Sequence, residues 1–348
     1  MRISAGARFR EVLARLRDWL CPPAIVLMYH RVSPVSRDPW QLAVTPAHFA
    51  EHLEVVRHHG RPVAIRSLTH ALAAGRTPGP AVAITLDDGY ADNLLHARPL
   101  LERHDAPATV FVAAGCLGRS GFWWDELERI ILTPVHLPEH LRLVVRGEVH
   151  AWGLGAGTHY PLEAQARDAA WPAWTDPPTG RHRLFVALYR LLRPLTDSER
   201  HQALAELDAW AGVTASPRSP ARPLTPPEVS RLAAGGLVEI GAHTLTHAQL
   251  SGLDREAQRR EIRGSRRALE ELAGDQVVSF AYPYGTRSDY TPETVALVQE
   301  AGFAGACAGV PGPVRRGTPL FEVPRFHVQD CDGDGLARRL AAWVTAAG

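Results

Sequence analysis

The sequence predicts an α/β fold built from repeated strand–helix units and interrupted by one long insertion. Two observations predict it. Short apolar runs suited to buried parallel strands alternate with amphipathic segments in two parts of the chain. Between residues 117 and 224 this alternation stops, and helical runs such as 183–192 occur among prolines and tryptophans. With 348 residues and 45% hydrophobic composition, the chain is long enough for one such domain carrying an insertion.

Apolar runs mark the expected strands, and proline and glycine mark the expected helix ends. Thr45 and Thr225 each precede a proline, which is the order of an N-cap residue and a first helical position. Gly60 and Gly274 are the expected helix stops. The expected strands cover residues 24–30, 81–89, 108–114, 237–243, 277–283 and 303–309.

These patterns divide the chain into four parts. We expect an N-terminal amphipathic helix in residues 1–21, the first part of the α/β domain in 22–116, a mostly helical insertion in 117–224, and the second part of the domain with a C-terminal helix in 225–348.

Charge and cysteine content exclude several classes of protein. The formal net charge is only +1, so the total charge does not favour nucleic acid or a strongly anionic partner. The four cysteines, at positions 21, 116, 307 and 331, lie too far apart for a zinc ribbon or a redox pair. We interpret them as reduced, buried thiols.

The N-terminal stretch has no apolar run long enough for a signal peptide, and no segment has the roughly 20 apolar residues of a membrane span. We therefore expect a cytoplasmic protein. Apolar residues at helical spacing in 7–20 are separated by arginines, so this helix either packs on its own domain or makes a peripheral contact with a membrane surface. Packing on the domain is the preferred interpretation.

Polar groups follow several expected strands, where parallel α/β domains carry their chemistry. The strongest pattern is ITLDDGY, in which Asp87 and Asp88 end an apolar strand directly before Gly89. Two adjacent carboxylates at this position turn in different directions, so one can bind a metal while the other handles a proton. Such acid pairs also bind Mg²⁺ in phosphoryl-transfer proteins, and a structural capping role for Asp88 is a further alternative.

A second pattern places two histidines at metal-ligand spacing. His243 and His247 follow a strand at i, i+4, and on a helix or tight turn this spacing brings both imidazoles to one face. Two histidines and one carboxylate leave coordination positions open, as a catalytic metal site requires. This set of donors suits Zn²⁺ best, with Co²⁺, Ni²⁺ or Fe²⁺ as alternatives.

A third pattern is SFAYPYG, in which Pro283 is followed by Tyr284 and Gly285. Proline and glycine predict a rigid loop at a strand end, with backbone that closely approaches another group. A backbone N–H in such a loop can stabilise an oxyanion. An ordinary turn is the alternative for this motif taken alone.

In this order, LMYHRV, TLDDG, HTLTH and FAYPYG resemble the polysaccharide deacetylase family, also called the NodB-homology or carbohydrate esterase family 4 group. The resemblance covers about residues 22–116 and 225–330 and leaves the insertion outside it. It implies a distorted (β/α)7-type barrel. It also implies a metal-dependent hydrolase that cleaves a carbon–nitrogen bond other than a peptide bond, releasing an N-acetyl group from a carbohydrate.

The resemblance implies roles for single residues as well. Asp87 is the expected general base. The backbone N–H of Tyr284 is the expected oxyanion donor, and Pro283 and Tyr284 are expected to contact the substrate. The expected metal ligands are Asp88, His243 and His247.

The sequence departs from the family pattern at two places. Many relatives have an arginine four residues before the motif's proline, where it steadies the catalytic carboxylate, and this chain has Ser279. Arg325, in FEVPRFHVQ, is our candidate replacement. The late histidine motif that supplies the general acid is also altered. His327 occurs in about the right region, on the same strand face as Arg325, and His30 in MYHRV is the second candidate.

We therefore expect an N-deacetylase that acts on an acetylated amino sugar in a polysaccharide, an oligosaccharide or a glycan precursor. An O-acetyl esterase is the nearest alternative, because metal-activated water can attack either acyl carbonyl. A non-catalytic carbohydrate-binding protein of the same fold is another, which Ser279 favours and the four filled motif positions oppose. Phosphoryl transfer is disfavoured, because the region of Asp87 has no lysine and the chain has no Walker-like loop.

The insertion carries two further candidates for substrate contact. Trp123 and Trp124 are adjacent in its sequence and are either platforms for a sugar or part of the insertion's own core. The large area that a tryptophan buries favours the core.

Overall fold

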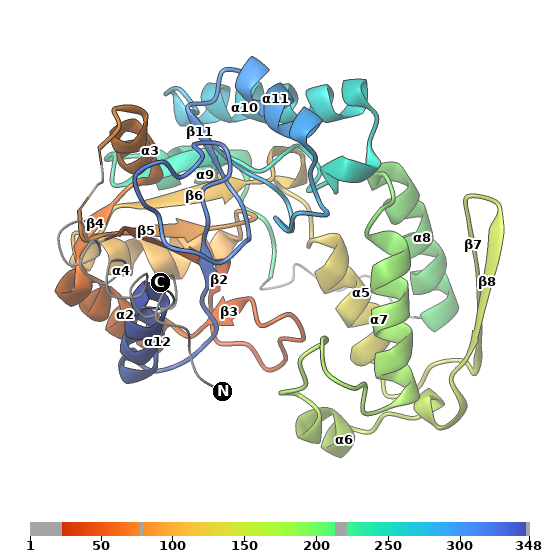
Figure 1. Ribbon diagram of the computed structural model, residues 1–348. Helices are drawn as coiled ribbons and strands as arrows, with labels where there is room; N and C mark the ends of the chain where they lie inside the picture. Colours follow the sequence, from red (N-terminus) through yellow and green to blue (C-terminus); the bar gives the residue numbers. More distant parts are fainter. Residues whose placement is uncertain (1–22, 77–78, 213–220, 346–348) are drawn as a thin grey trace, which may run out of the picture. The chain divides into compact units, whose positions relative to one another are not determined.

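The computed structural model describes residues 23–76, 79–212 and 221–345 (Figure 1). By its internal contacts the chain divides into two units. Unit 1 comprises Met1–Pro34, Ala43–Gly115 and Pro226–Gly348, and unit 2 comprises Val35–Leu42 and Cys116–Thr225. The amphipathic helix expected in residues 1–21 lies outside the described residues.

Unit 1 is built on an eight-stranded sheet in which all strand pairs are parallel. The strand order is β11-β10-β9-β6-β5-β1-β12, and β4 pairs with β5. The predicted α/β fold is confirmed, with all six expected strands present and the short strands β4 and β12 in addition. The strands are β1 (Ile25–Tyr29), β4 (Arg61–Val63), β5 (Ala81–Leu86), β6 (Ala108–Val112), β9 (Val238–Ala242), β10 (Ser279–Ala281), β11 (Gly305–Cys307) and β12 (Phe326–His327).

The segment 320–327 connects β11, at one edge of the sheet, with β1 near the other edge. The N–H of Ala306 donates to the carbonyl of Leu320, and the N–H of Val323 donates to the carbonyl of Ala306, each over 2.9 Å, so the segment runs beside β11. It then becomes β12, where Phe326 pairs with Leu27 of β1. The sheet therefore curls into a barrel-like wall.

Helices of unit 1 pack against these strands, among them α2, α3, α9 and α10. As predicted, α2 begins at Pro46 and α9 at Pro226, and Gly274 ends α10 in the left-handed conformation. None of the helices in the described part of the chain has the length and apolarity needed to span a membrane. The remaining elements of unit 1 are β2 (Arg31–Val32), β3 (Ala43–Val44), α2 (Pro46–His59), α3 (Ile65–Ala73), a π-helical turn (Asn93–Ala97), α4 (Arg98–Arg103), α9 (Pro226–Ala233), α10 (Arg255–Ala273), α11 (Pro292–Glu300) and α12 (Gly333–Thr345).

Alternate residues of the strands fill the interior of the barrel, as the two-residue period of a β-strand requires. Val26 of β1, Ala83 of β5 and Phe111 of β6 belong to one buried apolar cluster. Gly241 of β9 leaves room for the Phe111 ring, because a Cβ atom at this position would lie 2.4 Å from the ring's Cδ1. The same alternation continues to the carboxyl ends of the strands.

Unit 2 combines helices with an antiparallel hairpin. The hairpin β7–β8 was not expected in a region interpreted as mostly helical, and residues 35–42, which the sequence placed in the α/β domain, belong to this unit. Its elements are α5 (Trp123–Leu132), β7 (His140–Val145), β8 (Glu148–Gly153), α6 (Leu162–Arg167), α7 (Gly180–Leu192) and α8 (Asp197–Ala211).

Trp123 and Trp124 lie at the start of α5 and are both largely buried. The Trp123 ring stacks on Tyr189 at 4.9 Å between ring centroids, and Trp124 stacks on Phe122 at 4.8 Å. These contacts give both indoles a packing role within unit 2. A substrate contact by either side chain stays a prediction.

We expect Gly241→Ala to lower the free energy of unfolding by about 1–3 kcal/mol, because the added methyl group overpacks the interior against Phe111. Urea unfolding followed by tryptophan fluorescence measures the loss. Gly252→Ala is the matched control, since a Cβ atom there meets nothing within 4 Å. Combining Gly241→Ala with Phe111→Leu should recover part of the loss, and equal losses in the single and double variants would contradict the explanation.

Candidate active site

Asp87, directly after β5, forms a buried ion pair with Arg325. The guanidinium donates to both carboxylate oxygens, with Nη1 2.6 Å from Oδ1 and Nη2 2.8 Å from Oδ2. Asp87 is 3% exposed and Arg325 is 1% exposed. Alternation explains the position of Asp87, because Ala83 faces the interior and residues two and four positions later face the same way.

Three further contacts fix the Arg325 side chain. Its Nη1 lies 3.2 Å from Oγ1 of Thr85, and its Nε donates to the carbonyl of Ala308 over 3.0 Å. The guanidinium also lies over the Phe111 ring, 5.4 Å from the centroid. Thr85 was not predicted from the sequence, because a threonine in a strand gives no signal until the register of the strands is known.

Arg325 also determines the charge of Asp87. Burial alone raises the pKa of this carboxyl, but the positive charge and hydrogen bonds of the guanidinium outweigh burial and hold the pKa below its usual range. Asp87 is therefore ionised at neutral pH and can accept a proton.

Ser279 occupies the position where the resemblance implies an arginine. Its Oγ donates to Oε1 of Glu239 over 2.7 Å, and Oε2 of Glu239 accepts a hydrogen bond from Oγ1 of Thr109 over 3.0 Å. Position 279 thus belongs to a polar network near the amino ends of β6, β9 and β10. The guanidinium that contacts Asp87 comes instead from the segment 320–327.

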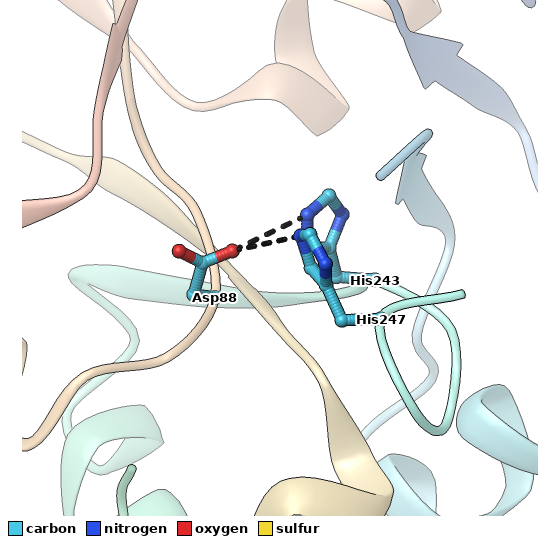
Figure 2. Close-up of side chains that lie close together, drawn as sticks. All are labelled: Asp88, His243 and His247. Carbon is cyan, nitrogen blue, oxygen red and sulfur yellow. Dashed lines mark ion pairs between the residues drawn. The ribbon is translucent and has the colours of Figure 1, made fainter. Parts of the chain in front are cut away.

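Asp88, His243 and His247 form the second part of the site, at the ends of β5 and β9 (Figure 2). Oδ1 of Asp88 lies 3.5 Å from Nε2 of His243 and 3.2 Å from Nε2 of His247. All three residues are buried, and one ligand atom of each lies within 4.8 Å of the others. The two histidines come from a turn rather than a helix.

The hydrogen bonding of this group suits a metal ion. Nδ1 of His243 donates to the carbonyl of Ala281 over 2.8 Å, so Nε2 of the neutral ring presents a lone pair toward Asp88. Oδ1 of Asp88 is buried and accepts no hydrogen bond of normal geometry. Two imidazole nitrogens and one carboxylate oxygen facing a common point are a donor set that a divalent transition metal fits.

The charge of Asp88 agrees with this interpretation. Burial raises the pKa of its carboxyl, but the hydrogen bonds and positive charge that the two imidazoles supply when they are protonated outweigh burial and hold the pKa well below its usual range. A bound cation would supply the same positive charge beside neutral rings. Asp88 is therefore ionised, as a metal ligand must be.

Left-handed backbone is concentrated in the three motifs. Seven non-glycine residues of the described chain have positive φ, and four of these lie at the site. Each such conformation costs about 1–2 kcal/mol for a residue with a side chain. Strain gathered in this way is typical of a functional site. The four residues are Asp88, Thr244, His247 and Tyr284, with φ of 72°, 64°, 53° and 61°.

The loop of Pro283 and Tyr284 meets the histidine loop. The Tyr284 ring packs edge-on against His247, with 4.7 Å between centroids. Gly285 follows with a φ of 72°, and a Cβ atom there would lie 2.4 Å from the backbone nitrogen of Gly309. The close backbone approach expected after Pro283 is therefore present, and it is an approach to another loop of the same barrel.

His30 and His327 lie together. Their rings are perpendicular, with 5.3 Å between centroids. Both follow the alternation that faces the interior, four residues after Val26 and two after Arg325. Burial, assisted by the neighbouring His30, lowers the pKa of His327 to about 3, so this ring is neutral at neutral pH.

The side chain of Cys307, on β11, also faces the interior of the barrel, but it does not supply a nucleophile. Burial raises the pKa of this thiol to about 12. Of the described cysteines, Cys116 and Cys307 are buried, Cys331 is partly exposed, and none of the three forms a disulfide.

The chain matches the family model described as polysaccharide deacetylase over residues 74–141 and 198–306, just over half of its length. The match ends before Arg325 and His327. A curated relative named for the same family, YxkH of Bacillus subtilis (strain 168), is 26% identical over 105 residues, which are 30% of this chain and 36% of YxkH. The similarity thus spans about a third of that relative.

Solved structures share the fold. Deacetylase PplD of Streptococcus pyogenes, in complex with acetate, gives a TM-score of 0.56 at 15% identity, covering 91% of this chain and 97% of PplD. IcaB from Ammonifex degensii gives 0.55 at 20% identity, covering 93% and 97%. BC0361, a polysaccharide deacetylase from Bacillus cereus, gives 0.52 at 15% identity, covering 92% and 69%. The predicted distorted (β/α) barrel is confirmed.

We expect Arg325→Met to lower the free energy of unfolding by about 3–5 kcal/mol, because it leaves the Asp87 carboxylate buried without a cation. Urea unfolding of the purified protein measures this loss. Arg316→Met, which replaces an exposed arginine, should change stability by less than about 0.5 kcal/mol.

The double variant Asp87→Asn/Arg325→Met tests the cause of that loss. Removing both charges should destabilise the protein less than Arg325→Met alone, because no uncompensated charge stays buried. Additive losses would contradict the coupling of the two side chains.

Proposed function

Because the chain belongs to the polysaccharide deacetylase family, we propose that it is a metal-dependent hydrolase. Its substrate is an N-acetylated amino sugar in a polysaccharide, an oligosaccharide or a glycan precursor. One observation carries this proposal. Asp87 is ionised and held by Arg325, and its neighbour in sequence, Asp88, forms a group of possible metal ligands with His243 and His247.

Asp88, His243 and His247 would hold the metal, with Zn²⁺ the preferred ion and Co²⁺, Ni²⁺ or Fe²⁺ as alternatives. When bound, the ion polarises the acetyl carbonyl and lowers the pKa of water. Arg325 occupies both oxygens of Asp87, which directs Asp87 to proton transfer rather than to metal binding.

The residues of the chain perform the remaining steps. Asp87 accepts a proton from the attacking water, whose oxygen adds to the acetyl carbon. The backbone N–H of Tyr284 donates to the oxyanion of the tetrahedral intermediate. The carbon–nitrogen bond then breaks as the amine takes up a proton, which leaves acetate and a free amino sugar. Pro283 fixes the loop that presents Tyr284.

We assign the proton donor to His30. The lowered pKa of His327 keeps that ring neutral before the substrate binds, so it is not an imidazolium acid. The two rings pack at right angles, so His327 can orient His30.

Two comparisons support deacetylation, and the second of them favours an N-acetyl group over an O-acetyl group. The fold is shared with a deacetylase described in complex with acetate, the acid that the reaction releases. It is also shared, at a TM-score of 0.50 and 14% identity, with a de-N-acetylase from Aggregatibacter actinomycetemcomitans.

We expect acetate release from N-acetylated sugars and glycan precursors by the metal-loaded protein and none after chelation. Asp87→Asn should lower the rate by about 10²–10⁴-fold, because the base is lost. Asp334→Asn, at an exposed carboxylate on α12, is the control and should act like the wild type. Acetate measured enzymatically across the panel decides between the functions.

Each other outcome has a definite meaning. Release from O-acetylated sugars alone would identify an esterase. Tight metal binding with no release from any member of the panel would favour a carbohydrate-binding protein. Release that survives both chelation and Asp87→Asn would contradict the proposed mechanism.

The dependence of the rate on pH tests His30. The alkaline limb of the kcat profile reports loss of the proton from the general acid. We expect His30→Gln to remove this limb and lower kcat by about 10²–10⁴-fold, while His327→Gln keeps the limb. If His327→Gln removes it and His30→Gln does not, the roles are reversed.

A further inference from the structure

We propose that Glu261 is a positioning residue for the metal site. Its carboxylate holds the loop between His243 and His247 in the conformation that presents both imidazoles to Asp88. The inference rests on the metal site of the proposed function and concerns a residue that lies outside the sequence motifs of that site.

The carboxylate of Glu261, on α10, accepts three hydrogen bonds from two consecutive residues of this loop. Oε2 accepts from the backbone N–H of Leu245 over 2.8 Å and of Thr246 over 2.9 Å. Oε1 accepts from Oγ1 of Thr246 over 2.8 Å.

The loop needs such a support, because its own conformation is strained. Thr244 and His247 both have left-handed backbone, which is uncommon for a residue with a side chain and least favourable for the β-branched Thr244. Leu245 and Thr246 lie between them, so the three hydrogen bonds act on the part of the loop that joins the two strained positions. Without them, the loop can relax by rotating His247 away from Asp88.

The packing of α10 shows that the loop is seated on the same face of this helix. Gly264 lies three residues after Glu261, and residues at this spacing are neighbours on a helix surface. A Cβ atom at Gly264 would lie 2.7 Å from Cδ1 of Leu245. Glycine is unfavourable inside a helix, and here it leaves the space that the Leu245 side chain fills.

A second contact holds the loop from the barrel. The N–H of Gly115 donates to the carbonyl of Leu245 over 2.7 Å, and a Cβ atom at Gly115 would lie 2.9 Å from that carbonyl oxygen. Leu245 is therefore fixed through its carbonyl by Gly115 and through its N–H by Glu261. Glu261 acts on the ligand group only through the backbone.

The test is the affinity of the protein for Zn²⁺, measured by competition with a chelator of known affinity. We expect Glu261→Ala to weaken binding about 10–100-fold, the range found when a supporting residue of a metal site is lost. Glu261→Gln should stay close to wild type, because an amide can accept from both backbone N–H groups and donate to Thr246. Glu271→Ala is the matched control, since Glu271 on the same helix pairs only with the exposed Arg267 among its described contacts.

The absorption spectrum of bound Co²⁺ gives a readout that a general loss of stability would not change. We expect Glu261→Ala, saturated with Co²⁺, to show visible bands different from those of the wild type, because His247 is displaced. If Glu261→Ala does not fold, Glu261→Asp replaces it, since the shorter side chain keeps the charge but does not reach the loop.

The outcomes separate this inference from the proposed function. Wild-type affinity and a wild-type Co²⁺ spectrum in Glu261→Ala, or in Glu261→Asp where that variant is used, would overturn the role of Glu261 and leave the metal site intact. A wild-type protein that binds neither ion would overturn the metal site itself.

Discussion

The two-residue period of the β-strands decides where the polar groups of this site lie. Alternate side chains face the interior of the barrel, where Phe111 belongs to a buried apolar cluster. The same alternation places Asp87 directly after β5 and Arg325 directly before β12, and their side chains meet. A shift of either strand by one residue would turn its polar group out of the barrel. The apolar cluster, which fixes the register, therefore also fixes the site.

Adjacent carboxylates would repel each other if they shared one environment, and the backbone prevents this. Asp88 has a φ of 72°, which turns its side chain away from that of Asp87. Asp87 is neutralised by a guanidinium that contacts both of its oxygens. Asp88 faces two imidazoles, and a buried carboxylate beside neutral rings keeps a charge that a bound cation would balance. The two acids can thus serve different roles although they are neighbours in sequence.

The sequence was sufficient for the longer strands and for the ligand group, because both depend on residue type and spacing. It was not sufficient for β4 (Arg-Pro-Val) and β12 (Phe-His), because neither lies in an apolar run like those that revealed the equally short β10 and β11. The left-handed conformations of Thr244 and His247 were equally unpredictable, since threonine rarely adopts this conformation and most histidines do not. Arg325 was found from its residue type and region, but Thr85, which holds it, looks like any strand threonine until the register is known.

The strained loops also support one another. Nδ1 of His243 donates to the carbonyl of Ala281, which connects the histidine loop to the strand before Pro283. The ring of Tyr284 packs on His247, which connects the same two loops a second time. Each contact needs the other loop in place, so the strain of one is offset by packing against its neighbour. A site assembled in this way is formed before any ligand arrives, and binding therefore loses little additional conformational freedom.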